Sequence, residues 1–283
     1  MGVLIIAKKE FRELVINPFL FVCILLFIIY IIINIYKYYN ISSGVLPNTR
    51  VAYDDEPFLA ISSFVFWPMK VYGAILGTVI GCTSISNERF GNALNTLLVK
   101  PIYRDTIING KFLGVFGFTA LSLTFIMTIY SAIMLCLYGN SIISHMGSYL
   151  IISFAMLFVI FIYVMVFIAF SMLLSILTKN QAFPFIFSLI FIYLLNLAPT
   201  VNFSENLSVL LPLGDGDSHG VVNTVLSSLP DGIIRSVQAI LFNMSYDAND
   251  WVTSILSNLV KLLVYVVTIL FIDYTLFVRR DIT

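Results

Sequence analysis

The sequence has little charge, which excludes most classes of soluble protein. Only 11% of its 283 residues are Asp, Glu, Lys or Arg, whereas a soluble domain carries about 25%. The 15 basic and 15 acidic side chains cancel, so the chain lacks the basic surface of a nucleic-acid binder. Hydrophobic residues make up 60% of the chain, and the mean hydropathy is +1.00. The solvent of this protein must therefore be largely lipid.

Side chains that commonly carry catalysis or bind metals are also scarce. The three cysteines, Cys23, Cys82 and Cys136, lie in apolar runs without a CxxC spacing, which indicates small hydrophobic side chains rather than a disulfide or a metal site. His219 follows two aspartates, but we expect a solvated loop there. No HExxH or paired intramembrane aspartate motif occurs, and a hydrolase needs a nucleophile and a base within reach of each other. We predict no catalytic residue, no bound cofactor and no metal in this chain.

Long apolar runs are abundant. A helix needs about 20 apolar residues to cross a hydrocarbon core about 30 Å thick, and unpaired backbone groups are too costly in lipid for any open structure. The runs are continuous, which excludes the alternation of a β-barrel. We therefore predict an all-α integral membrane protein with a single transmembrane domain of six helices. These helices are expected at residues 18–37, 65–86, 112–138, 148–177, 182–200 and 252–278.

Basic residues are distributed unevenly over the predicted loops, and their excess marks the cytoplasmic side. The basic residues on one side are Lys8, Lys9, Arg12, Arg89, Lys100, Arg104, Lys111, Lys179, Arg279 and Arg280. The other side has mainly Lys37, Arg50 and Arg235. We predict a multi-pass protein of the cell membrane with both termini in the cytoplasm. The outer segment 201–250 is too long for a bare loop, and we expect short interfacial or re-entrant helices in it.

The first residues, 3–17, have a helical period before the first transmembrane helix. The apolar positions are Leu4, Ala7, Phe11, Leu14 and Val15. The charged positions are Lys8, Lys9, Glu10, Arg12 and Glu13, which we place on the other face. This pattern predicts an amphipathic elbow helix in the cytoplasmic interface. It serves either as a simple anchor or as an element that transmits motion to the core.

The predicted cytoplasmic loop 87–111 contains a second amphipathic pattern. Its apolar residues recur at i, i+4, i+7 and i+8, which marks one helix face; they are Phe90, Leu94, Leu97 and Leu98. Glu88 and Arg89 precede this face, and Pro101 ends the helix because proline disfavours helix in the residue before it. The apolar face needs a cover, either the bilayer surface or a groove on a soluble partner.

This stretch resembles the cytoplasmic coupling loop of ABC transporter permeases of the type-2 export family, which serve multidrug and peptide export and nitrous-oxide-reductase maturation. The matching residues are Glu88, Leu94, Leu97, Leu98, Pro101, Arg104, Gly110 and Lys111. The elbow residues Lys8, Lys9, Glu10 and Phe11 and the Arg-Arg-Asp tail at 279–281 are also similar to the family. One departure is Asn92–Ala93–Leu94, where the family commonly has Gly-Thr-Leu, with Gly91 one position early.

The resemblance implies a permease subunit that pairs with an identical or related permease and exports cargo. The residues it implies for docking on a separate ABC ATPase, present in two copies, are Glu88, Arg89, Phe90, Gly91, Leu94, Leu97, Leu98 and Pro101. ATP and magnesium would bind to that ATPase, because this chain has no Walker A motif. The apolar core favours a hydrophobic or amphipathic cargo. The alternatives are a mechanotransmission complex acting on an extracytoplasmic partner, and a membrane enzyme acting on lipid or peptide.

Besides Lys37 at the end of the first predicted helix, three charged residues fall inside the predicted helices. Asp273 lies near the cytoplasmic end of the last helix, where a basic side chain or water could pair with it. Lys70 and Lys261 lie toward the outer ends of their helices, and we expect both to snorkel to the interface. Ionisable residues at membrane depth are functional candidates by default. We therefore single out Asp273 and Lys261 as candidate intramembrane functional residues.

Overall fold

The computed structural model describes residues 2–42, 57–90, 104–178, 182–197, 217–242 and 248–279. Every regular element within these ranges is a helix, which confirms the all-α prediction. The helices are α1 (Gly2–Ile16), α2 (Pro18–Ser42), α3 (Pro57–Phe90), α5 (Arg104–Ser144), α6 (Met146–Leu177), α7 (Ala182–Leu197), α9 (Asp217–Ser228), α10 (Pro230–Leu241) and α11 (Ala248–Arg279).

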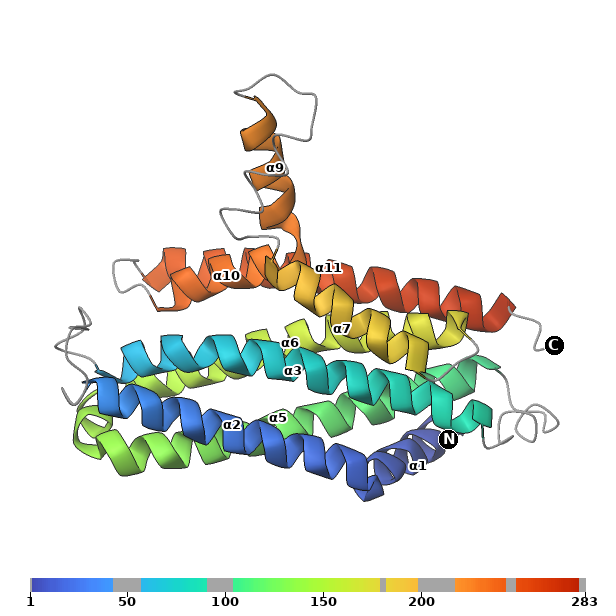
Figure 1. Ribbon diagram of the computed structural model, residues 1–283, viewed down its shortest axis with the longest axis horizontal. Helices are drawn as coiled ribbons and strands as arrows, with labels where there is room; N and C mark the ends of the chain where they lie inside the picture. The colour runs from blue at the N-terminus through green and yellow to red at the C-terminus, as the bar shows by residue number, and fades with distance from the viewer. Residues whose placement is uncertain are drawn as a thin grey trace.

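The long helices run side by side along the bundle, while α9 projects from it (Figure 1). The N-terminal helix α1 and the C-terminal end of α11 lie at the same end, which we call the α1 end (Figure 1). This arrangement agrees with an even number of crossings between the two termini. Which side of a membrane the α1 end faces stays a prediction from the basic residues.

Five helices in the described part of the chain are long and apolar enough to cross a membrane. Their candidate spans are Pro18–Lys37, Val65–Ile85, Thr106–Asn140, Met146–Leu177 and Trp251–Phe277. The fifth predicted span, 182–200, corresponds to α7, an apolar helix of only 16 residues. At 1.5 Å per residue α7 is about 24 Å long, so it falls short of a hydrocarbon core of about 30 Å.

The helix α10 reaches into the bundle where α7 ends. In Figure 1, α7 runs from the α1 end to about the middle of the bundle, and α10 runs from there along α11 toward the opposite end. The guanidinium of Arg235 on α10 donates a hydrogen bond to the carbonyl oxygen of Asn196 near the end of α7, at 3.1 Å. The short helices predicted between the last two spans are therefore present as α9 and α10, and α10 packs into the bundle. That this segment lies on the outer side of the membrane stays a prediction.

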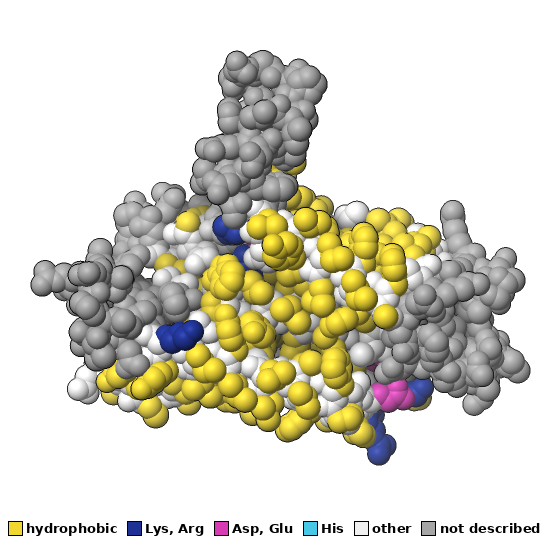
Figure 2. All heavy atoms as spheres, viewed as in Figure 1, with side chains coloured by type: hydrophobic (Ala, Val, Ile, Leu, Met, Phe, Trp, Pro, Cys, Tyr) yellow, Lys and Arg dark blue, Asp and Glu magenta, His cyan; other side chains and the backbone are white. Residues whose placement is uncertain are grey.

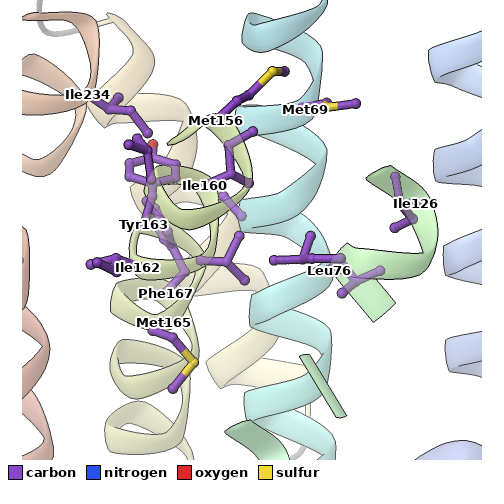
Figure 3. Packing of buried hydrophobic residues seen from close by; sticks show 14 of the residues in the cluster. Met69, Leu76, Ile126, Met156, Ile160, Ile162, Tyr163, Met165, Phe167 and Ile234 are labelled. Atoms are coloured by element: carbon purple, nitrogen blue, oxygen red, sulfur yellow. The ribbon is translucent and has the colours of Figure 1, made fainter. Parts of the chain in front are cut away.

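The centre of the bundle is formed by α3 and α6, which approach closely because α3 has glycines at every fourth position. These glycines are Gly73, Gly77 and Gly81. A Cβ atom at Gly81 would lie 1.9 Å from the hydroxyl oxygen of Ser171, and one at Gly77 would lie 2.9 Å from a methyl of Val164. Small residues allow such backbone approach between membrane helices. Figure 3 shows the buried side chains of α6 between α3 on one side and Ile234 of α10 on the other.

The exterior is apolar, as a lipid solvent requires. Large hydrophobic side chains are exposed along α2, α5, α6, α7 and α11. Figure 2 shows them over most of the visible face, with acidic and basic side chains at the α1 end and further basic side chains elsewhere, including at the opposite end. In water this surface would be a severe aggregation hazard, but in a bilayer it contacts acyl chains.

Several helices extend beyond the predicted boundaries. The helix α5 begins at Arg104, so residues 104–111, which we assigned to the coupling loop, are helical. The helix α3 begins at Pro57 rather than at residue 65. Apolarity marks where a helix enters lipid, and a helix can continue past that point wherever its backbone pairs with itself. The predicted end of the third span at 138 corresponds to a kink, because Tyr138 has φ −127° and ψ 26°.

Candidate functional site

The elbow helix α1 packs on α5 rather than lying free in the interface. A Cβ atom at Gly110 would lie 2.7 Å from the Cβ of Ile6, and one at Gly114 would lie 2.8 Å from the carbonyl oxygen of Ala7. Larger residues at these two positions would push α1 away from α5. Gly110, the glycine of the Gly-Lys pair that resembles the family, therefore allows the close contact between α1 and α5.

Three buried polar residues join α1 to α3 and α5, and we call them the elbow node: Glu10, Ser84 and Lys111. The ammonium of Lys111 donates to Glu10 Oε2 at 2.9 Å and to the carbonyl oxygen of Ser84 at 2.7 Å. The hydroxyl of Ser84 donates to Glu10 Oε1 at 2.5 Å. Glu10 is 4% exposed and Lys111 is 3% exposed. Both charges are thus removed from solvent and hydrogen-bonded, as a stable buried ion pair requires.

The elbow node lies where the chain leaves the bundle for the predicted coupling loop. Ser84 belongs to the last turns of α3, and Lys111 belongs to the first turns of α5. The segment between these helices, residues 91–103, lies outside the described residues. The elbow node therefore holds three elements together at the base of that segment.

The prediction that Glu10 lies on the exposed charged face is wrong. Glu10 is buried together with Ala7 and Leu14, whereas Leu4 and Val15 are 67% and 51% exposed. The spacing of three and four residues from Ala7 through Glu10 to Leu14 was visible in the sequence, but an ionisable side chain argued against a buried position. The other charged elbow residues are exposed, namely Lys8, Lys9, Arg12 and Glu13. Phe11 packs its ring edge-on against Phe118, with centroids 6.2 Å apart.

The predicted ATPase-docking residues are described only in part. Glu88, Arg89 and Phe90 form the end of α3, at the α1 end of the bundle. The remaining docking residues lie outside the described residues, namely Gly91, Leu94, Leu97, Leu98 and Pro101. Their role as a docking surface stays a prediction.

A second buried charge network lies at the start of α10, and we call it the re-entrant cluster: Lys70, Tyr163, Asp231 and Arg235. Lys70 of α3 forms an ion pair with Asp231 Oδ1, and both side chains are 1% exposed. The hydroxyl of Tyr163 donates to the same oxygen at 3.4 Å, and Arg235 Nε donates to Asp231 Oδ2 at 2.8 Å. The cluster ties α3, α6 and α10 together deep in the bundle.

The expectation that Lys70 snorkels to the interface is wrong, because α10 brings Asp231 to it. Sequence reasoning did not single out Asp231 or Arg235, since both belong to a segment assigned to the outer loop. One local signal existed. An acid and an arginine four residues apart, beginning directly after a proline, are typical of a helix start.

The two intramembrane candidates differ in their surroundings. Asp273 is 0% exposed, and neither carboxylate oxygen has a hydrogen-bond partner among the described residues. Lys261 is exposed on α11, with its ammonium 3.4 Å from Asn258 Oδ1. Lys261 also lies deeper than expected: it is ten residues, or about 15 Å of helix, beyond Trp251 at the start of the candidate span.

Metal-binding geometry is not seen in the part of the chain that the structure describes. No group of three or more His, Cys, Asp or Glu side chains there could hold a metal ion. Asp215, which the sequence places near His219, lies outside the described residues.

The structure defines the class as a multi-pass helical membrane protein, whose elbow helix α1 is hydrogen-bonded to α3 and α5. Sequence comparison gives the family. The profile of the ABC-2 family transporter proteins matches residues 4–282. Because the match covers nearly the whole chain, the protein belongs to this family and is a permease component of an ABC transporter. This confirms the resemblance noted in the coupling loop. No curated protein matches the chain.

Proposed function

We propose that this chain is one permease of an ATP-driven exporter that contains two permeases and two copies of a separate ABC ATPase. It lies in the cell membrane with both termini in the cytoplasm. ATP and magnesium bind to the ATPase, and this chain carries no catalytic step. The cargo is hydrophobic or amphipathic. The family membership and the elbow node support this proposal.

The elbow node is the observation that carries the mechanism. A force on segment 91–103 acts on the end of α3 and the start of α5, because these helices flank it. Glu10 bonds to both, so the two helix ends and α1 move as one unit. A two-state change of the ATPase would thereby be converted into a rigid movement of the permease.

The close packing of α3 on α6 passes the movement further into the bundle. The glycine contacts leave no room for α3 to slide without displacing Val164, Ile168 or Ser171. Movement of α3 is therefore passed to α6, and from α6 to the re-entrant cluster through Tyr163. The path from the coupling segment to the middle of the bundle is continuous in packed side chains.

Substitution of the elbow node tests this mechanism. Lys111→Met and Glu10→Gln should reduce cargo transport about tenfold or more in the purified complex while ATP hydrolysis continues, because the charged link is lost. The matched control is the exposed pair on the same helix, Lys9→Met with Glu13→Gln, whose atoms are 3.5 Å apart. The control should transport normally. Unchanged transport in both elbow-node variants would sink the mechanism.

Purification from native membranes tests the assembly itself. An ABC ATPase should co-purify with the chain in equal amounts, and the mass of the complex should correspond to two copies of each. A chain that purifies alone and whose activity does not depend on ATP would contradict the proposed function.

A further inference from the structure

The last helix, α11, has three distinct faces. The first face is buried against the rest of the bundle at spacings of three, four and seven residues. It consists of Ile255, Leu259, Leu262, Val266 and Asp273. The second face is apolar and exposed. It consists of Val252, Leu256, Val260, Leu263, Val267 and Phe271, each at least 44% exposed. The second face is the surface that acyl chains would cover.

The third face of α11 is polar over most of the candidate span, and we call it the polar stripe. It consists of Ser254, Ser257, Asn258, Lys261, Tyr265, Thr268 and Thr275. All of these are exposed or half-buried. Several of the smaller groups bond to their own helix: Thr268, for example, donates to the carbonyl oxygen of Val264 at 2.7 Å. Hydroxyls bonded in this way tolerate lipid, but the ammonium of Lys261 does not.

The depth of Lys261 decides how the polar stripe is solvated. The span Trp251–Phe277 has 27 residues, or about 40 Å, against a hydrocarbon core of about 30 Å. With the span centred, Lys261 lies roughly 10 Å inside the core. Charged residues at such depth face a bundle interior or a water-filled cavity, because contact with lipid is costly. The polar stripe is therefore not a lipid-facing surface.

A second polar element lies on the same side. The hydroxyl of Tyr265 donates to the carbonyl oxygen of Ser228 at 3.1 Å, which places the end of α9 against the polar stripe. Thr224, Ser227 and Ser228 of α9 are exposed, and α9 projects from the bundle beside α10 and α11 (Figure 1). The polar residues at this end of α9 also need water around them rather than acyl chains.

The charge of the polar stripe indicates what it binds. Lys261 forms no ion pair among the described residues, and its ammonium contacts only the neutral Asn258. The acid of the same helix, Asp273, belongs to the buried face. A lysine among hydroxyls in a water-filled cavity attracts an anionic group, because the surrounding walls of low dielectric constant focus its field.

We propose that the polar stripe lines the water-filled cargo path of the assembled transporter, and that Lys261 binds an anionic group, a carboxylate or a phosphate, of an amphipathic cargo. This inference rests on the proposed export function, for which it names the class of cargo. The exposed apolar face beside the stripe accepts the surrounding lipid.

Charge-selective labelling in native membranes tests the proposal. The three native cysteines are replaced, and Thr268→Cys is introduced with Lys261 either retained or changed to Gln. An anionic water-soluble methanethiosulfonate should modify this cysteine, about fivefold faster with Lys261 than with Lys261→Gln. A cationic methanethiosulfonate should show the opposite preference. Val267→Cys, on the apolar face at the same depth, is the matched control and should react with neither reagent.

Three outcomes overturn the proposal. Absence of modification at Thr268→Cys shows that water does not reach the stripe. Equal rates with and without Lys261 show that its charge does not act on an anion. Efficient disulfide cross-linking between copies without modification shows that a second chain covers the stripe. The labelling does not need the ATPase, so failure of co-purification together with charge-selective labelling would remove ATP-driven export and leave the water-filled path.

Discussion

The elbow node and the re-entrant cluster are both buried charge networks, but they differ in balance and in position. The elbow node pairs one carboxylate with one ammonium and lies at the edge of the bundle, on the short helix α1. The re-entrant cluster places one carboxylate, Asp231, against two cations, and it lies between α3, α6 and α10. The side chain of Arg235 is 38% exposed, so the surplus charge reaches the surface of the cluster.

This difference separates a link at the edge of the bundle from one in its centre. If a substitution breaks the elbow node, the short helix α1 at the edge can yield and let water reach the remaining charge, which limits the cost of the substitution. The start of α10 has no such freedom, because Asp231 is enclosed by α3 and α6. We therefore expect the re-entrant cluster to dominate stability and the elbow node to dominate coupling.

The largest loss of stability is expected at the re-entrant cluster. Asp231→Ala leaves the ammonium of Lys70 buried without its carboxylate, which costs about 3–5 kcal/mol. Thermal unfolding in detergent should show this loss. The double variant Asp231→Leu with Lys70→Met should recover much of the stability. Equal stability of wild type and Asp231→Ala would show that the cluster is not a structural link.

The next largest loss of stability is expected where α3 and α6 approach each other closely. Gly81→Val would bring a Cβ atom to 2.6 Å from the carbonyl oxygen of Ile168, and such overpacking costs about 1–3 kcal/mol or more. The control is Gly117→Ala, where the nearest atom would be 3.7 Å away, on the ring of Phe11. The control should unfold at nearly the wild-type temperature. If both variants unfold alike, the glycine contacts do not set the distance between these helices.

A smaller change in stability is expected at the elbow node. Glu10→Ala should destabilise by about 1–3 kcal/mol, because α1 can move and let water reach Lys111. The same variant should lose transport strongly, unlike variants of equal stability elsewhere. The measurement is thermal unfolding together with transport in liposomes. A loss of stability as large as that of Asp231→Ala would remove the distinction between the two networks.

The exposed pair Lys9–Glu13 should contribute least. Surface ion pairs at i, i+4 contribute about 0.3–0.5 kcal/mol and weaken with salt. Lys9→Met should therefore leave both unfolding and transport within error of the wild type. A marked effect of this substitution would indicate that α1 contacts another chain through its exposed face.

Apolar run length predicted the membrane-spanning helices well. Residues 148–177 correspond to α6 at Met146–Leu177, since a bilayer sets a minimum length of apolar helix. The same criterion did not find the ends of α3 and α5, because helices continue beyond lipid without an apolar requirement. The elbow helix was predicted as an element, but its buried face was assigned incorrectly at Glu10.

The partners of ionisable residues could not be predicted from one sequence. Lys70 and Asp231 are 161 residues apart, and Glu10 and Lys111 are 101 apart. No local period relates such positions. A lone lysine in an apolar run looks the same whether it snorkels to the interface or meets a carboxylate from a distant helix.

The sequence by itself determined that lipid surrounds the protein, that the fold is all-α, how many apolar runs there are, and the resemblance to type-2 ABC permeases. These follow from composition, run length and local spacing, which need no knowledge of neighbours. Only the tertiary structure decided that α10 re-enters the bundle, that Glu10 is buried, and that Lys261 lies on a face separate from the lipid-facing one. Those facts depend on which helices lie side by side, because burial and charge pairing are properties of the space between helices rather than of any one segment.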